Sequence, residues 1–168
     1  MRIRTYVLFV FALLIIFNAG TDKAGLTEGY RKGDIAPGIE SLKTDADITF
    51  SNGSGSYTLL HFWAAYDAGS RMHNVQLWNK LIKNDLSYIK MISVSLDKQE
   101  SIFAETVKAD RLEATNQIHE TLGEHSEVYK KYGLKKGLKN FLIDNEGVIV
   151  ATNITPENLS EFINKQLY

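Results

Sequence analysis

The chain has 168 residues, a formal net charge of −1, 44% hydrophobic and 23% charged residues, and no cysteine. This length and composition predict one globular domain with a hydrophobic core and a short extension. The charge balance gives no electrostatic reason to expect nucleic acid as a partner. The lack of cysteine excludes disulfides, thiolate metal ligands and thiol nucleophiles within this sequence.

The amino-terminal residues are typical of an export signal. Arg2 and Arg4 precede an apolar run of residues 6–17, and small or polar residues follow it. The run is shorter than the roughly 20 residues that a membrane span needs. Residues 1–20 are therefore predicted to be a signal peptide, with an uncleaved N-terminal anchor as the alternative. In both cases the rest of the chain is expected in the cell envelope or periplasm, and it would touch the membrane only through an uncleaved segment.

Residues 21–32 are polar, have no hydrophobic period and are predicted to be a linker to a domain over residues 33–168. Short strands are predicted at 39–42 and 48–50. The Ser- and Gly-rich residues 51–56 are predicted to form a turn.

An apolar and aromatic run from Leu59 to Ala65 is predicted to be a buried strand that ends at Asp67. A helix is predicted directly after it, because the next apolar residues are spaced three or four apart: Met72, Val75, Trp78, Leu81 and Ile82. A helix that starts at the end of a strand presents unpaired N–H groups and partial positive charge there. This junction is therefore the first place to look for a functional site.

The remaining elements complete an α/β pattern. A second strand is predicted over residues 88–96, and Asp97 is predicted to cap a helix that runs to Ala109. A short helix over 126–132 precedes a hairpin, whose strands 141–144 and 148–150 flank Asn145-Glu146-Gly147. Thr155 and Pro156 open a closing helix. This order predicts a central mixed β-sheet flanked by helices.

The junction resembles the active-site segment of the thioredoxin-like superfamily, in particular its exported TlpA/ResA-type thiol-disulfide oxidoreductases. Those proteins carry Phe-Trp-Ala-x-Trp-Cys-x-x-Cys-Arg, and this chain has Phe62-Trp63-Ala64-Ala65-Tyr66-Asp67-Ala68-Gly69-Ser70-Arg71. Similar strings occur in the same order at residues 33–37, 95–98, 132–134 and 141–147. The resemblance implies a thioredoxin-like fold over about residues 33–166.

The resemblance also places Asp67 and Ser70 at the two cysteine positions. Thiol-disulfide exchange needs a thiolate that attacks a disulfide and a second thiol that resolves the mixed disulfide. Asp67 and Ser70 can do neither, and Asp67 is predicted to cap the following helix. Leu138 stands where the family has a cis-proline. Its peptide bond is predicted to be trans, because a non-proline cis bond costs about 2.5–4 kcal/mol.

His61 has two interpretations. It stands where thioredoxins often carry a buried acid, and the favoured interpretation is a neutral, hydrogen-bonded core histidine. The alternative is a Ser-His-Asp arrangement with Ser70 and Asp67. His61, Arg71 and His73 are kept as possible binding residues.

Two aromatic side chains beside the turn also have alternatives. Trp63 and Tyr66 either pack on top of the sheet or line an exposed ridge that contacts a peptide. A lysine cluster around Leu138 is interpreted as a solvated face, with a patch for an acidic partner as the alternative: Lys130, Lys131, Lys135, Lys136 and Lys139. A metal site drawn from His119, Glu120, Glu124 and His125 is the disfavoured interpretation of these residues.

The predicted function is a non-catalytic binding or structural module in the cell envelope, which contacts an extended peptide or another envelope protein. No cofactor and no metal are expected. One alternative is membership of the TlpA-like oxidoreductases with a role in redox homeostasis, and another is an enzyme with different chemistry between Asp67 and Ser70. The predicted degenerate active-site positions are Trp63, Tyr66, Asp67, Ser70 and Leu138.

Overall fold

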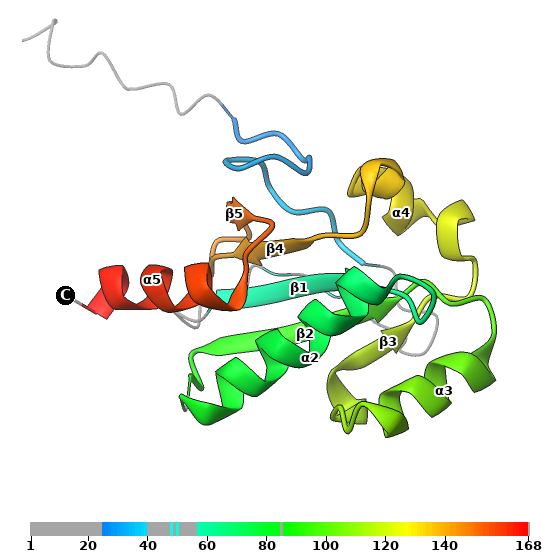
Figure 1. The fold of residues 1–168 in the computed structure, drawn as a ribbon. Coiled ribbons are helices and arrows are strands. Elements are labelled where there is room, and N and C mark those ends of the chain that lie inside the picture. The colour runs from blue at the N-terminus through cyan, green and yellow to red at the C-terminus, as the bar shows by residue number, and fades with distance from the viewer. Residues whose placement is uncertain (1–24, 40–47, 49, 51–56, 85, 168) are drawn as a thin grey trace, which may run out of the picture.

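The structure is a computed structural model that describes residues 25–39, 48, 50, 57–84 and 86–167 (Figure 1). The predicted signal peptide or anchor and the predicted turn at residues 51–56 lie outside the described residues. Among the described residues, no helix has the length and apolar character needed to cross a bilayer.

The centre of the fold is a five-stranded mixed sheet with strand order β3-β2-β1-β4-β5. Three neighbouring strands run parallel: β1 (Tyr57–Trp63), β2 (Ile89–Ser95) and β3 (Gln117–His119). β4 (Asn140–Ile143) runs antiparallel to β1, and β5 (Ile149–Thr152) runs antiparallel to β4. The predicted α/β class with a mixed central sheet is confirmed.

β1 lies in the middle of the sheet because its sequence is apolar on both faces. Six of its seven residues are buried, as expected for a strand that is covered on both sides. Leu60 and Phe62 face one core cluster, whereas Leu59 faces the other. The turn that follows β1 is therefore anchored at its start by a buried strand.

The described residues form four α-helices around the sheet: α2 (Ala68–Lys83), α3 (Glu100–Ala109), α4 (Glu127–Lys131) and α5 (Pro156–Leu167). Leu77 of α2 and Leu159 of α5 belong to the same core cluster as Leu59, so α2 and α5 cover one face together (Figure 1). Val128 of α4 belongs to the cluster on the other face. The two faces of the sheet are thus covered by helices from different parts of the chain.

Several local predictions are confirmed. The Asp144 carboxylate accepts hydrogen bonds from the backbone N–H groups of Glu146 and Val148, which closes the predicted hairpin between β4 and β5. Ser126 Oγ accepts from the Tyr129 N–H at the start of α4. Thr155 Oγ1 accepts from the Asn158 N–H at 3.3 Å and caps α5.

The residues before the first strand fold back onto the domain. Ile39 and Ile48 exchange backbone hydrogen bonds of 3.1 and 2.9 Å, which is the described part of the two short strands predicted here. The N–H of Ile35 donates to the carbonyl of Thr27, and the N–H of Gly29 donates to the carbonyl of Ile35. Part of the predicted linker therefore packs against the domain.

Candidate functional site at the end of the central strand

The chain turns from β1 into α2 between Ala64 and Ser70. Asp67 is the N-cap of α2, with an extended backbone (φ −101°, ψ 94°), and its Oδ1 accepts from the Ser70 N–H at 2.8 Å. The Ser70 hydroxyl donates to the Asp67 carbonyl oxygen at 3.2 Å. The predicted capping role of Asp67 is confirmed. Both side chains are used in the hydrogen bonds of the turn itself.

His61 lies beneath this turn and is 1% exposed. Its Nε2 lies 2.9 Å from the Ser70 carbonyl oxygen, and because a carbonyl only accepts, Nε2 carries the proton. Nδ1 is buried and has no hydrogen-bond partner among the described residues. Burial is the main cause that lowers the pKa of His61 to about 4, although the Ser70 carbonyl acts in the opposite direction. His61 is therefore the neutral core histidine that the sequence predicts.

The alternative Ser-His-Asp arrangement does not form. The structure brings His61, Asp67 and Ser70 together, but the imidazole meets the backbone carbonyl of Ser70 rather than its hydroxyl. That hydroxyl donates to a second backbone carbonyl. A nucleophile needs a base that can take its proton, and neither hydrogen bond provides one.

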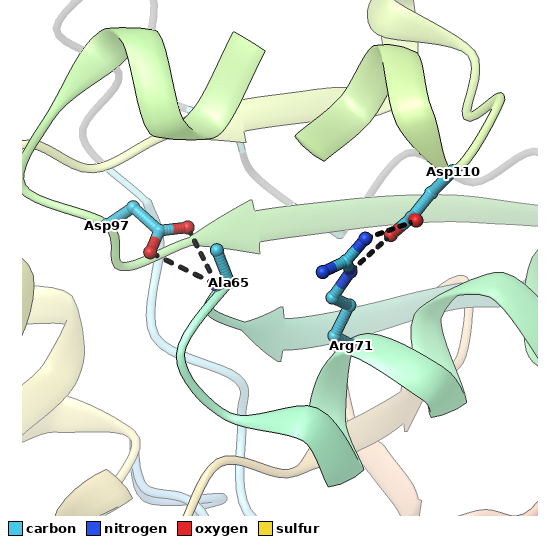
Figure 2. A network of polar contacts seen from close by, with 4 residues as sticks. All are labelled: Ala65, Arg71, Asp97 and Asp110. Carbon is cyan, nitrogen blue, oxygen red and sulfur yellow. Dashed lines mark hydrogen bonds and ion pairs between the residues drawn. The ribbon is translucent and has the colours of Figure 1, made fainter. Parts of the chain in front are cut away.

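Asp97 connects the turn to the loop after β2. Its carboxylate is 3% exposed and accepts from the Ala65 N–H, at 3.0 Å to Oδ1 and 2.9 Å to Oδ2 (Figure 2). Oδ2 also accepts from the Ser95 hydroxyl at 2.8 Å. The prediction that Asp97 caps α3 is wrong, because Gln99 is the N-cap and Asp97 is taken by the turn.

Arg71 connects the turn to the far end of α3. Its Nε donates to Oδ2 of Asp110 at 2.7 Å and its Nη2 to Oδ1 at 2.6 Å, so the two side chains form a two-pronged ion pair (Figure 2). Hydrogen bonding to Asp110 is the main cause that raises the pKa of Arg71. Arg71 is predicted as a possible binding residue, and two of its nitrogen atoms already donate to Asp110 within the chain.

The two aromatic residues of the turn have different surroundings. Trp63 is fully buried, its Nε1 donates to Gln117 Oε1 at 3.1 Å, and it packs against Phe103. Tyr66 is 66% exposed. Trp63 therefore packs within the fold, whereas the side chain of Tyr66 faces solvent.

The loop before β4 lies beside the turn and follows the prediction for Leu138. All described peptide bonds are trans, including that of Leu138. Gly137 has φ 126°, a conformation that favours glycine. The Lys139 carbonyl accepts from the Phe62 N–H at 3.1 Å, and Leu138 packs against the core. Leu138 is thus a half-buried residue in a loop whose described peptide bonds are trans.

The remaining predicted histidines are not drawn into one cluster. His73 is half-buried on α2. His119 is stacked on Phe103, and its Nε2 donates to the Asp97 carbonyl at 2.6 Å. Within the described ranges, no group of three acidic or histidine side chains is placed to hold a metal ion.

Two hollows are lined in part by residues of the turn. A hollow of about 460 Å³ lies between the start of α2 and Asp110 and is lined mainly by Ala65, Ala68, Met72 and Val75. A second, of about 320 Å³, lies between Tyr66 and the loop after β2. The turn therefore offers concave surface and an exposed aromatic ring, both of which suit binding.

Comparisons with known proteins agree with this geometry. No protein-family model matches the chain, and neither does any curated protein. A thioredoxin-like protein from Parabacteroides distasonis is 56% identical, with 83% of this chain and 98% of that chain covered and a TM-score of 0.76. A thiol-disulfide oxidoreductase from Bacteroides fragilis is 26% identical, with 66% and 81% covered and a TM-score of 0.58. The thioredoxin domain of a thiol-disulfide oxidoreductase from Bacteroides vulgatus shares the fold at 23% identity, with 82% and 99% covered and a TM-score of 0.68.

Proposed function

Because this chain belongs to the thioredoxin-like proteins, we propose that it is a member without redox activity that binds another polypeptide at the turn between β1 and α2. The observation that carries the proposal is the state of the two positions where the family has cysteines. Asp67 caps α2, and Ser70 is bonded back to the Asp67 carbonyl. The turn is kept as a structure while its oxygen atoms cannot perform disulfide exchange.

Support for binding comes from side chains that the turn exposes. Tyr66 is 66% exposed and Met72 is 51% exposed, and a large apolar side chain that faces solvent beside a hollow is typical of a contact surface. Asp97 and the Arg71–Asp110 pair hold the turn from two sides. A rigid surface loses little conformational entropy when a partner binds, which favours affinity.

The proposed location of the partner is the cell envelope. This part of the proposal rests on Arg2, Arg4 and the apolar run of residues 6–17. The proposed partner is an extended peptide or a second envelope protein, and the loop of Leu138 lies next to the proposed contact surface.

Site-specific photo-crosslinking in the full chain tests this function. A photoreactive residue at position 66 is compared with the same residue at position 82, because Ile82 is 59% exposed near the opposite end of α2. We expect a discrete crosslinked polypeptide from position 66 and not from position 82. Equal labelling from both positions, or none from position 66, would contradict the proposal.

A further inference from the structure

The smaller hollow is formed by three segments that meet at the carboxyl-terminal end of the parallel strands. β1, β2 and β3 are parallel neighbours, so the segments that follow them leave the sheet at the same end. Tyr66 follows β1, Asp97 follows β2 and Glu124 follows β3. The carboxyl ends of parallel strands are a usual place for ligands in α/β proteins. β4 pairs with the other side of β1, so this hollow lies away from the Leu138 loop.

The hollow of about 320 Å³ has an apolar part and an acidic part. Leu96, Ile102 and the ring of Tyr66 supply apolar surface. Asp97 and Glu124 supply carboxylates, and Lys98 is the one base among its described lining residues. The Asp97 carboxylate already accepts from Ala65 and Ser95. The Glu124 carboxylate has no hydrogen bond or ion pair with the described part of the chain and is free to accept one.

The ring of Tyr66 lies in the field of several carboxylates. Its pKa is raised mainly by burial and then by the charges of Glu124, Asp97 and Asp67. An aromatic face attracts a cation, and nearby carboxylates strengthen that attraction. An anionic ligand would be repelled by the same groups, and a purely apolar one would leave the acidic part without a partner.

These features together fit one kind of side chain. Arginine and lysine carry an aliphatic stem that can lie on Ile102 and a cationic end that can meet Glu124 and the ring of Tyr66. Arginine fits better, because its planar guanidinium can stack on the ring and donate two hydrogen bonds to one carboxylate. Building on the proposed function, we propose that this hollow receives a basic side chain, arginine in the first place, of the bound polypeptide.

A pair of short peptides that differ in one charge tests the proposal. The probes are acetyl-Gly-Ser-Arg-Ser-Gly-amide and the same peptide with citrulline, which keeps the shape of arginine but is neutral. Each is titrated into the full, isotope-labelled chain, and the NMR signals of the amides of Tyr66, Ile102 and Glu124 are followed. We expect the arginine peptide to shift them with a Kd on the order of 1 mM, as one exposed side-chain site allows. Citrulline is expected to bind about fivefold more weakly or not at all.

Three charge variants make the test sharper. Glu124→Gln is expected to weaken the arginine peptide about three- to tenfold. Its matched control is Glu146→Gln, which makes the same charge change in the exposed hairpin before β5 and should leave the Kd unchanged. Lys98→Gln removes the positive charge that lines the hollow and should therefore strengthen binding of the arginine peptide about twofold to threefold. A damaged fold could not produce that gain.

The results separate this inference from the proposed function. Equal binding of the arginine and citrulline peptides, or weaker binding by Lys98→Gln, would overturn the basic side chain as the occupant. A specific crosslink from position 66 would leave the binding function standing in that case. Loss of the crosslink together with failure of the peptides would overturn both.

Discussion

Burial keeps His61 neutral in the folded state, and this makes the stability of the domain depend on pH. Its Nε2–H is bonded to the Ser70 carbonyl, and its Nδ1 has no partner in the described part of the chain. A proton on Nδ1 would be both buried and unpaired, so the folded state resists it. The histidine stabilises the turn as a neutral donor and not as a base.

The depressed pKa of His61 predicts a loss of stability in mild acid. Its pKa is about 4 in the folded state against 6.5 for the unperturbed side chain. Above pH 6.5 both states are neutral, and as the pH falls toward 4 only the unfolded state takes up the proton. The free energy of unfolding should therefore fall by about 3 kcal/mol across this window.

Urea unfolding at several pH values measures this loss in the original chain, in His61→Gln and in His125→Gln. His125 is exposed, and its variant is the matched control for a histidine-to-glutamine change outside the core. The His61 variant should lose most of the decline between pH 6.5 and 4. Parallel curves for all three proteins would show that His61 is not the group that titrates.

Asp67 is the second residue whose role can be measured alone. Because its Oδ1 accepts from the Ser70 N–H, Asp67→Ala should lower the free energy of unfolding by about 1 kcal/mol. Asp67→Asn and Asp67→Ser keep a capping oxygen and should cost less. Denaturant unfolding gives these values directly. If Asp67→Ala were neutral or stabilising, the side chain would serve a ligand and not the helix.

At the scale of the elements, the turn is held between two helices and two strands. Asp97 joins the end of β2 to the backbone of Ala65, and Arg71 at the start of α2 is paired with Asp110 at the end of α3. These contacts fix the direction in which α2 leaves the sheet.

A double-mutant cycle measures the coupling between α2 and α3. The variants are Arg71→Leu, Asp110→Asn and their combination. The geometry is two-pronged, but the Arg71 side chain is 37% exposed and therefore screened by solvent. We expect a coupling energy of about 1 kcal/mol that decreases with added salt. Additive effects of the two single variants would show that the pair contributes nothing to stability.

At the scale of the whole molecule, the chain combines a thioredoxin-like fold with a turn that contains no cysteine. The scaffold places a helix N-terminus at residue 68, where a thiolate would be stabilised if a cysteine were present. The described peptide bonds of the Leu138 loop are trans, and the half-buried Leu138 side chain packs against the core.

A double cysteine variant tests the geometry of the turn and the effect of the Leu138 loop independently. The original protein should show no disulfide reductase turnover above the uncatalysed rate. Asp67→Cys with Ser70→Cys should form a disulfide, because the backbone of the turn is kept, but should exchange poorly with substrates beside Leu138. Thiol titration and a reductase assay measure the two properties. Vigorous turnover by the double variant would show that the Leu138 loop does not limit exchange.

Local features of this chain could be predicted from its sequence. The buried strand before Asp67, the Asp67 cap, the hairpin around Gly147 and the start of α5 at Pro156 all depend on residues within a few positions of one another. Periodicity and capping rules describe interactions of this range. The sequence likewise shows that neither position 67 nor position 70 carries a thiol.

Only the tertiary structure decided which distant groups meet at the turn. Asp97 lies 32 residues from Ala65, Arg71 lies 39 residues from Asp110, and the ring of Trp63 finds an acceptor 54 residues away. Asp97 has the sequence signature of a helix cap, yet its carboxylate is taken by a backbone N–H that the parallel pairing of β1 with β2 brings beside it. Sheet pairing determines these neighbours, and it depends on the burial of the whole core and not on the residues adjacent in the chain.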